Sequence, residues 1–495
     1  MRRVGAGLAA ALLLAGCGST VQMQRRSSLD AGLSSVGVAG GPTTAPTSSD
    51  PGRQDRTSTS ARGSSSLSAG TGGASTGAGG AGPAGIAVGS GASAPITIGM
   101  LVTASSGVSS LGYSFGNTVD EQTVDRALVT ALNAAGGLDG HKIIPVFAST
   151  DTFSSSWEPE FTAACAAFTQ DHKVQAVLGF AFDYFASFES CLANRGVPHL
   201  TTSFNIPDRQ ELSHYPGMVA LDVPTVDRRG LAKVDGAVGT GFLTAKNKLG
   251  ILTDDCPGST RSLQKVVLPF IARAGLPAPT VYTLSCVNGY AESSNAGAQL
   301  SNAELAFAAG GIDRVMMYGV SEGPGMAQFA ITAQSQNYHP GYIVSSLATL
   351  ALNNGYVPAA QTRNVRGFGW LPMVDVPVSA YGAMNSSQRR CLSLLRSQGI
   401  RPAASADFEY AWQICEPFFV YEAALKRDGD RTDLDSVVTA VRGLGSGFVS
   451  TTNLDGQALY GAGRADAILA ARPLVYADAC SCWRYVGAAR VIPSP

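Results

Sequence analysis

The sequence predicts an α/β fold made of two lobes, each built around a parallel β-sheet. The first observation is that short apolar runs alternate with amphipathic stretches from Pro95 onward. Such runs are typical of strands buried on both faces, because helices cover both faces of a parallel sheet. The second observation is that the same alternation starts again after a connector near Pro224, which indicates two lobes of similar construction.

The apolar and amphipathic periods place the elements in order. In the first lobe we expect strands at 96–102, 142–148, 174–179, 197–202 and 218–222, and helices at 117–135, 157–170 and 184–194. In the second lobe we expect strands at 248–253, 280–284, 314–318 and 342–346, and helices at 260–274, 298–309 and 326–336. Later helices are expected at 386–398, 407–426 and 433–442. The folded part thus divides into lobe 1 (95–223), lobe 2 (224–375), helices that return to lobe 1 (376–450) and C-terminal strands that complete the lobes (451–495).

The first residues have the features of a bacterial lipoprotein signal peptide. Arg2 and Arg3 are positive, and residues 4–15 are apolar but too short to span a bilayer. Residues 14–17, Leu-Ala-Gly-Cys, resemble a lipobox. We expect residues 1–16 to be removed and lipid to be attached to Cys17, so that the protein is extracytoplasmic and membrane-anchored. A plain secretory peptide with an incidental cysteine is the alternative.

A linker is expected to separate the anchor from the lobes. Residues 17–94 are mostly Gly, Ser, Thr, Ala and Pro. A segment of this composition cannot bury enough apolar surface to offset its ordering entropy, so we expect it to be disordered. For the whole chain, 35 Lys and Arg are balanced by 36 Asp and Glu. This balance excludes a nucleic-acid binder that acts through a basic surface.

The cysteines suggest an oxidising compartment. Nine are present, and eight remain when Cys17 is reserved for lipid. An even number in an exported chain points to disulfides, although eight cysteines allow many connectivities. A zinc site is disfavoured because no CxxC pair exists and no histidine lies at ligand spacing from a cysteine. Proximity in sequence favours the pairs Cys165–Cys191, Cys256–Cys286, Cys391–Cys415 and, as a tight pair, Cys480–Cys482.

Several stretches resemble one protein family. Residues 96–101 (Ile-Thr-Ile-Gly-Met-Leu), a Ser/Gly-rich loop, a helix and then 133–143 (Asn-Ala-Ala-Gly-Gly-Leu-Asp-Gly-His-Lys-Ile) closely resemble the start of type I periplasmic binding proteins. More narrowly, they resemble the branched-chain amino acid-type substrate-binding proteins of ABC transporters. The resemblance covers nearly all of 95–495 in element order and implies two Rossmann-like lobes joined by a hinge. Within it, Gly136 and Gly137 are expected to end a helix in the left-handed conformation, before a tight turn at Asp139-Gly140.

The resemblance also implies a function. Such a protein captures a small molecule by closing its lobes on it and delivers it to an ABC permease in the membrane. We therefore expect a monomer with a small-molecule ligand, and no cofactor, metal or nucleic-acid partner. A ligand-sensing or wall-associated lipoprotein that uses the same fold without transport is the alternative.

The ligand is expected beyond the carboxyl ends of the strands, where open α/β sheets bind small molecules. In the first lobe this region comprises loops near 103–116, 180–185 and 203–206; the facing lobe would contribute loops near 254–259 and 321–325. The candidate ligand-binding residues are Ser105, Ser106, Tyr113, Phe182, Asp183, Tyr184, Ser203, Phe204, Ser321 and Glu322.

Two acidic candidates bear on the class of ligand. Asp183 stands where the resembled amino-acid binders have a small hydroxyl residue, and an ionised aspartate would repel a ligand carboxylate. We therefore expect a ligand that is aromatic, amide-bearing or cationic; the alternative is that Asp183 only caps a helix beginning at Tyr184. Glu322 is a candidate partner for a ligand ammonium group, with a solvated surface carboxylate as the alternative.

An enzymatic function is disfavoured. Residues 112–116, Gly-Tyr-Ser-Phe-Gly, match the G-x-S-x-G pattern of a hydrolase nucleophile elbow. An elbow needs a strand that runs directly into the serine, whereas the strand here is expected to end near Val102. The five histidines show no recognisable triad placement. Hydrolysis at Ser114 is kept only as a remote alternative.

Overall fold

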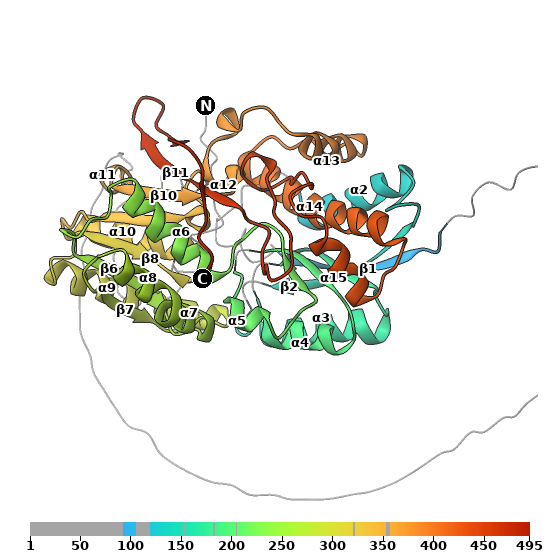
Figure 1. Ribbon diagram of the computed structural model, residues 1–495, viewed down its shortest axis with the longest axis horizontal. Coiled ribbons are helices and arrows are strands. Elements are labelled where there is room, and N and C mark those ends of the chain that lie inside the picture. Colours follow the sequence, from blue (N-terminus) through green and yellow to red (C-terminus); the bar gives the residue numbers. More distant parts are fainter. Residues whose placement is uncertain are drawn as a thin grey trace, which may run out of the picture. The chain divides into compact units, whose positions relative to one another are not determined.

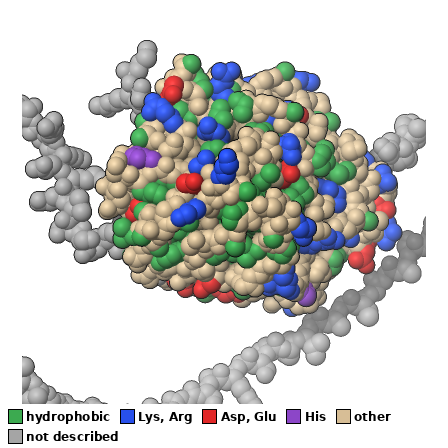
Figure 2. Space-filling view, turned by 60° about the vertical axis from the view of Figure 1, so that its left-hand side comes forward, with side chains coloured by type: hydrophobic (Ala, Val, Ile, Leu, Met, Phe, Trp, Pro, Cys, Tyr) green, Lys and Arg blue, Asp and Glu red, His purple; other side chains and the backbone are tan. Residues whose placement is uncertain are grey.

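The computed structural model describes residues 93–104, 119–151, 154–181, 184–203, 205–319, 322–352 and 357–495. The expected signal peptide, Cys17 and nearly all of the linker lie outside these residues. Within them, no helix is long and apolar enough to cross a membrane. On the face shown in Figure 2, basic and acidic side chains are interspersed with hydrophobic and other ones, which agrees with the near-zero net charge.

The first sheet has five parallel strands in the order β2-β1-β3-β4-β5. They are β1 (Ile96–Ala104), β2 (Ile143–Asp151), β3 (Ala176–Ala181), β4 (His199–Ser203) and β5 (Met218–Ala220). Every residue of β3 and β4 is buried, as expected for strands covered on both faces. The strand order reverses between β1 and β3, and a doubly wound sheet leaves a crevice beyond the carboxyl ends at such a point.

Two groups of helices cover this sheet (Figure 1). On one side, α3 (Glu158–Ala166), a π-helical turn (Ala167–Asp171) and α4 (Ala186–Asn194) enclose an aromatic cluster that includes Phe161, Phe168 and Phe188. The apolar side chains of the other side belong to a separate cluster. Its helices are α2 (Glu121–Ala134), α13 (Ser386–Ser397), α14 (Ser405–Asp428) and α15 (Leu434–Arg442). Helix α14 packs on β3 and β4, so these C-terminal helices return to the first lobe.

The second sheet repeats the strand order of the first and extends it. Its parallel strands lie in the order β7-β6-β8-β9-β10, and β11 and β12 follow in antiparallel pairing. The strands are β6 (Leu249–Asp254), β7 (Thr280–Leu284), β8 (Arg314–Met317), β9 (Gly341–Ser345), β10 (Val365–Gly369), β11 (Ala470–Ala477), β12 (Cys482–Tyr485) and β13 (Arg490–Val491), which pairs with β11. The C-terminal strands therefore complete the second sheet rather than both lobes. From the segment after α15, the first sheet receives a single bridge, between Ala220 and Asp466.

The helices of the second lobe also form two groups. The helix α6 (Val226–Gly239), a π-helical turn (Leu263–Val267) and α8 (Leu268–Arg273) contribute to the same apolar cluster as α14, and α7 (Pro257–Ser262) leads directly into the π-helical turn. The helices α9 (Tyr290–Ala309) and α10 (Gly323–Ser335) flank a second cluster around Phe307, Phe329 and Tyr342. Three short helices, α5 (Arg209–Leu212), α11 (Ala359–Thr362) and α12 (Pro372–Asp375), lie in connections.

The turn between α2 and β2 has the conformation that the sequence predicts. Helix α2 ends at Ala134, and both following glycines have positive φ, 107° at Gly136 and 84° at Gly137. Asp139 and Gly140 also have positive φ, 50° and 89°. This motif is therefore structural, because its glycines end a helix and reverse the chain.

Three connections pass between the lobes, and they are hydrogen-bonded to one another and to the first lobe around buried Asp222. Its Oδ1 accepts a hydrogen bond from the backbone N of Ser203 at 3.1 Å, and its Oδ2 accepts one from Nε2 of Gln413, also at 3.1 Å. Its backbone oxygen accepts a hydrogen bond from Nε1 of Trp370 at 2.9 Å. The backbone N of Leu454, in the third connection, donates to the backbone oxygen of Trp370 at 2.8 Å. The hinge is thus a hydrogen-bonded bundle inside a continuous apolar core.

Four disulfides join Cys165 to Cys191, Cys256 to Cys286, Cys391 to Cys415 and Cys480 to Cys482. These are the pairs that proximity in sequence favours. Three of them span 24 to 30 residues, whereas the last spans two. A cross-link that closes a longer loop removes more entropy from the unfolded chain.

We predict that the third disulfide stabilises the fold and the fourth hardly does. Replacing Cys391 and Cys415 together by alanine should lower the free energy of unfolding by about 3 kcal/mol, because their bond closes a long loop between α13 and α14. The matched control, alanine at both Cys480 and Cys482, should change it by less than about 1 kcal/mol. Urea unfolding measures both values, and equal losses in the two variants would contradict the loop-entropy argument.

Candidate functional site

The crevice beyond the carboxyl ends of β1, β3 and β4 is the candidate ligand site, since the strand order reverses there. Most of the predicted ligand-binding residues lie outside the described part of the chain. These are Ser105, Ser106, Tyr113, Phe182, Asp183, Phe204 and Ser321. The structure describes Tyr184, Ser203 and Glu322, and it gives each of them contacts within the protein.

Glu322 does not have the predicted role. Its side chain is 2% exposed, and its Oε2 lies 2.9 Å from Nζ of Lys233, which is fully buried in α6. Its Oε1 accepts a hydrogen bond from the backbone N of Ser345 at the end of β9. The alternative of a solvated surface carboxylate is therefore wrong, and the carboxylate expected for a ligand ammonium group is paired with Lys233 in this structure. The buried ion pair instead ties α6 to the second sheet, since Lys233 also donates to the backbone oxygen of Met317 at 2.5 Å.

Ser203, the last residue of β4, is hydrogen-bonded to Asp222 and Asn205. Its backbone N donates to Asp222, and its hydroxyl exchanges hydrogen bonds with the backbone of Asn205 at 3.3 and 3.4 Å. The side chain is 1% exposed. Its contacts therefore position the hinge at the edge of the crevice.

Tyr184 lies just before α4 and contacts α5 of the first lobe. Its hydroxyl donates to Oε1 of Glu211 at 3.0 Å, and burial together with this carboxylate raises the pKa of Tyr184. Helix α4 begins at Ala186, and its N-cap residue, Phe185, makes no side-chain capping hydrogen bond. The helix therefore begins two residues later than expected, and Asp183 itself lies outside the described residues. Phe185 and Phe188 belong to the aromatic core, as their three-residue spacing indicates.

Glu211, the partner of Tyr184, also takes part in an ionic contact between the lobes. Arg261, on α7 of the second lobe, donates from Nε and Nη2 to the two carboxylate oxygens of Asp208 at 2.8 and 2.7 Å. Its Nη2 also donates to Oε2 of Glu211 at 2.9 Å. The backbone N of Trp157 donates to the backbone oxygen of Asn288 at 3.2 Å, a second contact between the lobes. No local pattern in the sequence marks these pairs, because their members are about fifty or more residues apart.

Carboxyl groups gather near the carboxyl ends of β1 and β4, beside α14. Glu121 accepts a backbone hydrogen bond from Thr103, near the end of β1. Asp222 accepts one from the backbone N of Ser203, at the end of β4. Glu409 lies on α14, one turn before Gln413, which is the partner of Asp222. Because β3 lies between β1 and β4 in the sheet, these carboxyls flank the point where the strand order reverses.

Two of these carboxyls have oxygens without a hydrogen-bond partner. Oε1 of Glu409, whose side chain is 5% exposed, is buried and unpartnered, and so is Oε2 of Glu121. Burial, followed by repulsion from Asp222 and Glu121, raises the pKa of Glu409 to about 8. Burial also raises the pKa of Glu121 to about 8 and that of Asp222 to about 7. A cation placed among these groups would favour their charged forms.

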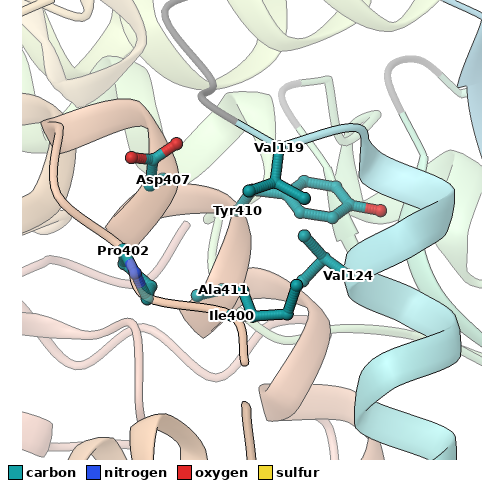
Figure 3. A pocket seen from close by; sticks show the side chains of 7 residues that line it. All are labelled: Val119, Val124, Ile400, Pro402, Asp407, Tyr410 and Ala411. Carbon is teal, nitrogen blue, oxygen red and sulfur yellow. The ribbon is translucent and has the colours of Figure 1, made fainter. Parts of the chain in front are cut away.

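A small gap lies between α2 and α14 (Figure 3). Val119 and Val124 face Tyr410 and Ala411 across a gap of about 10 Å³, room for about one water molecule. The hydroxyl of Tyr410 donates to Oδ1 of Asp125 at 2.8 Å. This gap is therefore too small for a ligand, and a ligand would approach the carboxyls from the crevice.

Metal binding and a nucleophile elbow can be checked only within the part of the chain that the structure describes. The described residues contain no group of three or more His, Cys, Asp or Glu side chains that could hold a metal ion. Strand β1 ends at Ala104, so no described strand runs directly into Ser114. The carboxyl cluster was not predicted from the sequence, because Glu409 is one of several acidic residues on a helix that reads as amphipathic.

We predict that Glu409→Gln stabilises the unliganded protein at high pH. The pKa of Glu409 is raised on folding, so the folded state holds a proton that the unfolded state has released; stability therefore falls as the pH rises from about 4.5 to about 8. The variant lacks this loss and should exceed the parent by about 1–3 kcal/mol at pH 8, with little difference at pH 4.5. Denaturant unfolding across this range tests it, with exposed Glu158→Gln as control. A constant difference at all pH values would contradict the assignment.

Comparison with known proteins bears on the fold. No family model and no curated protein matches the chain. Among solved structures, an ABC transporter substrate-binding protein from Desulfitobacterium hafniense matches with a TM-score of 0.53 at 15% identity, covering 79% of this chain and all of that one.

Two further structures extend the comparison. The branched-chain amino acid transporter substrate-binding protein LivJ from Streptococcus pneumoniae, in complex with isoleucine, has a TM-score of 0.53 at 15% identity; 80% of this chain and 99% of that chain are covered. A solute-binding protein of an ABC transporter from R. palustris, in complex with 4-hydroxybenzoate, has a TM-score of 0.56 at 12% identity; 81% and 98% are covered. With its two lobes of like strand order, the chain has the type I periplasmic binding protein fold of the substrate-binding proteins of ABC transporters.

Proposed function

We propose that this protein is an extracytoplasmic solute-binding lipoprotein that captures a small amine-bearing molecule by lobe closure and presents it to an ABC importer. The fold supports capture between two lobes that share a buried hinge. The observation that carries the class of ligand is the buried, unpartnered carboxyl oxygens of Glu409 and Glu121 at the crevice. No covalent step and no cofactor is required for this function.

The carboxyl cluster favours ligands with an ammonium group over purely anionic ones. An ammonium group within about 4 Å of Glu409 would gain a few kcal/mol of Coulomb energy at the effective dielectric of a partly buried site. A carboxylate in the same place would be repelled by a similar amount. The similar folds have been crystallised with isoleucine and with 4-hydroxybenzoate, so the fold alone does not decide between the two classes. Zwitterionic amino acids fit if their ammonium end faces the cluster.

The contact between the lobes supports a closing mechanism. Arg261 reaches from the second lobe to Asp208 and Glu211 of the first, and Glu211 also holds Tyr184 beside the crevice. Opening the lobes would break this ion pair, so a ligand that holds both lobes together would preserve it. The anchor on Cys17, the linker and the monomeric state belong to this proposal and rest on the sequence.

Three molecules of similar shape and different charge test the ligand class. In calorimetry at pH 7, phenethylamine and phenylalanine should bind at least about tenfold more tightly than 3-phenylpropanoate, because charged hydrogen bonds contribute about 1.5–3 kcal/mol. Glu409→Gln should remove most of the preference, whereas the exposed control Glu158→Gln should keep it. If 3-phenylpropanoate binds the parent more tightly than the two amines and phenylalanine displaces it, the proposed ligand class is contradicted. That result would still support solute capture at this site.

A further inference from the structure

A second cavity lies beside the edge strand of the first sheet. Its volume is about 330 Å³, within the range of about 300–1,000 Å³ that is usual for small-molecule sites. It is bounded by α5, the start of β5, the end of α15 and the loop 460–466. It contacts Met218 and Val219, the first residues of β5, whereas the crevice begins beyond the opposite end of the strands.

Three arginines line this cavity and carry its charge. Arg209, Arg442 and Arg464 come from three different segments, and none of them forms an ion pair with a described carboxylate. The one carboxylate of the lining, Asp466, is already occupied, because it pairs with Arg228 and accepts a hydrogen bond from the backbone N of Thr225 at 3.0 Å. The cavity therefore has an excess of positive charge.

Buried guanidinium groups around the cavity also lack hydrogen-bond acceptors. Nη2 of Arg464 donates to the backbone oxygen of Ile468 at 2.8 Å, but its Nε is buried without a partner. Arg228, 7% exposed, has two such nitrogens, Nε and Nη2. Burial and the nearby charge of Arg228 lower the pKa of Arg464. An anion in the cavity would relieve this repulsion and supply an acceptor.

The remaining wall is mostly apolar, with the hydroxyls of Ser213 and Tyr460 as its polar groups. Leu212, Met218 and Val441 are buried, and Tyr215 and Val219 are partly buried. A ligand that fills the cavity therefore needs a compact apolar body as well as a charged group. Guanidinium groups bind phosphate through paired N–H donors, and a doubly charged phosphate matches several unpaired arginines better than a single carboxylate does.

We propose that this cavity is a second ligand site, separate from the crevice, for a small phosphate monoester with a compact apolar group. The arginines hold the phosphate, and Met218, Val219 and Val441 contact the apolar group. The proposal rests on the cavity and its unpaired cations and is independent of the transport function.

Calorimetry on the full chain carrying Cys17→Ser, with its disulfides formed, tests the site with phenyl phosphate. We expect one molecule per chain, bound at least about tenfold more tightly than inorganic phosphate or uncharged benzyl alcohol, with affinity falling as salt is added. Arg442→Gln and Arg464→Gln should each weaken binding about tenfold. Arg396→Gln, on the exposed side of α13, and Glu409→Gln, at the crevice, should leave it unchanged.

Any one of three results would overturn the proposal of a second ligand site. These are no binding of phenyl phosphate, equal affinity in parent and Arg442→Gln, or loss of binding in Glu409→Gln. Arg442 is exposed at the end of α15, so its replacement is not expected to disturb folding, and a matching thermal midpoint verifies this. The Arg442 variant therefore decides the test even if Arg464→Gln is poorly folded.

Discussion

The position of the two lobes depends on one buried aspartate. The side chain of Asp222 accepts hydrogen bonds from the end of β4 and from a glutamine of α14, and its backbone oxygen accepts one from the indole of Trp370, so this residue joins two of the three connections between the lobes to the first lobe. A buried carboxylate without such donors would be strongly destabilising, and here backbone and amide donors satisfy both oxygens. Burial still raises the pKa of Asp222 to about 7, so its charge is sensitive to whatever lies beside it.

This hinge also shapes the crevice. The contact between Gln413 and Asp222 fixes α14 beside the end of β4, and Glu409 lies one turn earlier on the same helix. The site therefore holds acidic groups in a buried environment of low dielectric, where ionising them costs free energy. In the unliganded protein this cost lowers the stability of the fold. Natural proteins keep such groups at functional sites, where a ligand supplies the missing charge. The second lobe is stabilised differently, since its buried Glu322 is already paired with Lys233.

Much of the fold could be predicted from the sequence because continuous apolar runs mark strands buried on both faces. The strand at 280–284 was predicted with its bounds, and the glycines after α2 adopt the expected positive φ. Helix α6 was missed because its buried face carries Asp227, Arg228, Arg229 and Lys233, which hide the apolar period. Strand β10 was missed because two of its five residues are glycine.

The site was harder to predict, for a physical reason. Glu322 follows a strand end, as a ligand residue would, but its partner Lys233 is 89 residues earlier in the chain. The pKa of Glu409 is raised partly by Asp222 and Glu121, which are distant in sequence and come near it only in the folded chain. Local patterns specify elements, whereas the charge of a site depends on contacts between distant segments.

Proton release on ligand binding tests the central claim most directly. An amine that binds among carboxyls of raised pKa must lower those pKa values and displace protons. Calorimetry of phenethylamine binding at pH 7, in two buffers of different ionisation enthalpy, measures the number of protons released per ligand bound. The account predicts release of about one proton per ligand, reduced in Glu409→Gln. Binding with no exchange of protons, or with proton uptake, would contradict recognition of the ligand's cation by these buried carboxyls.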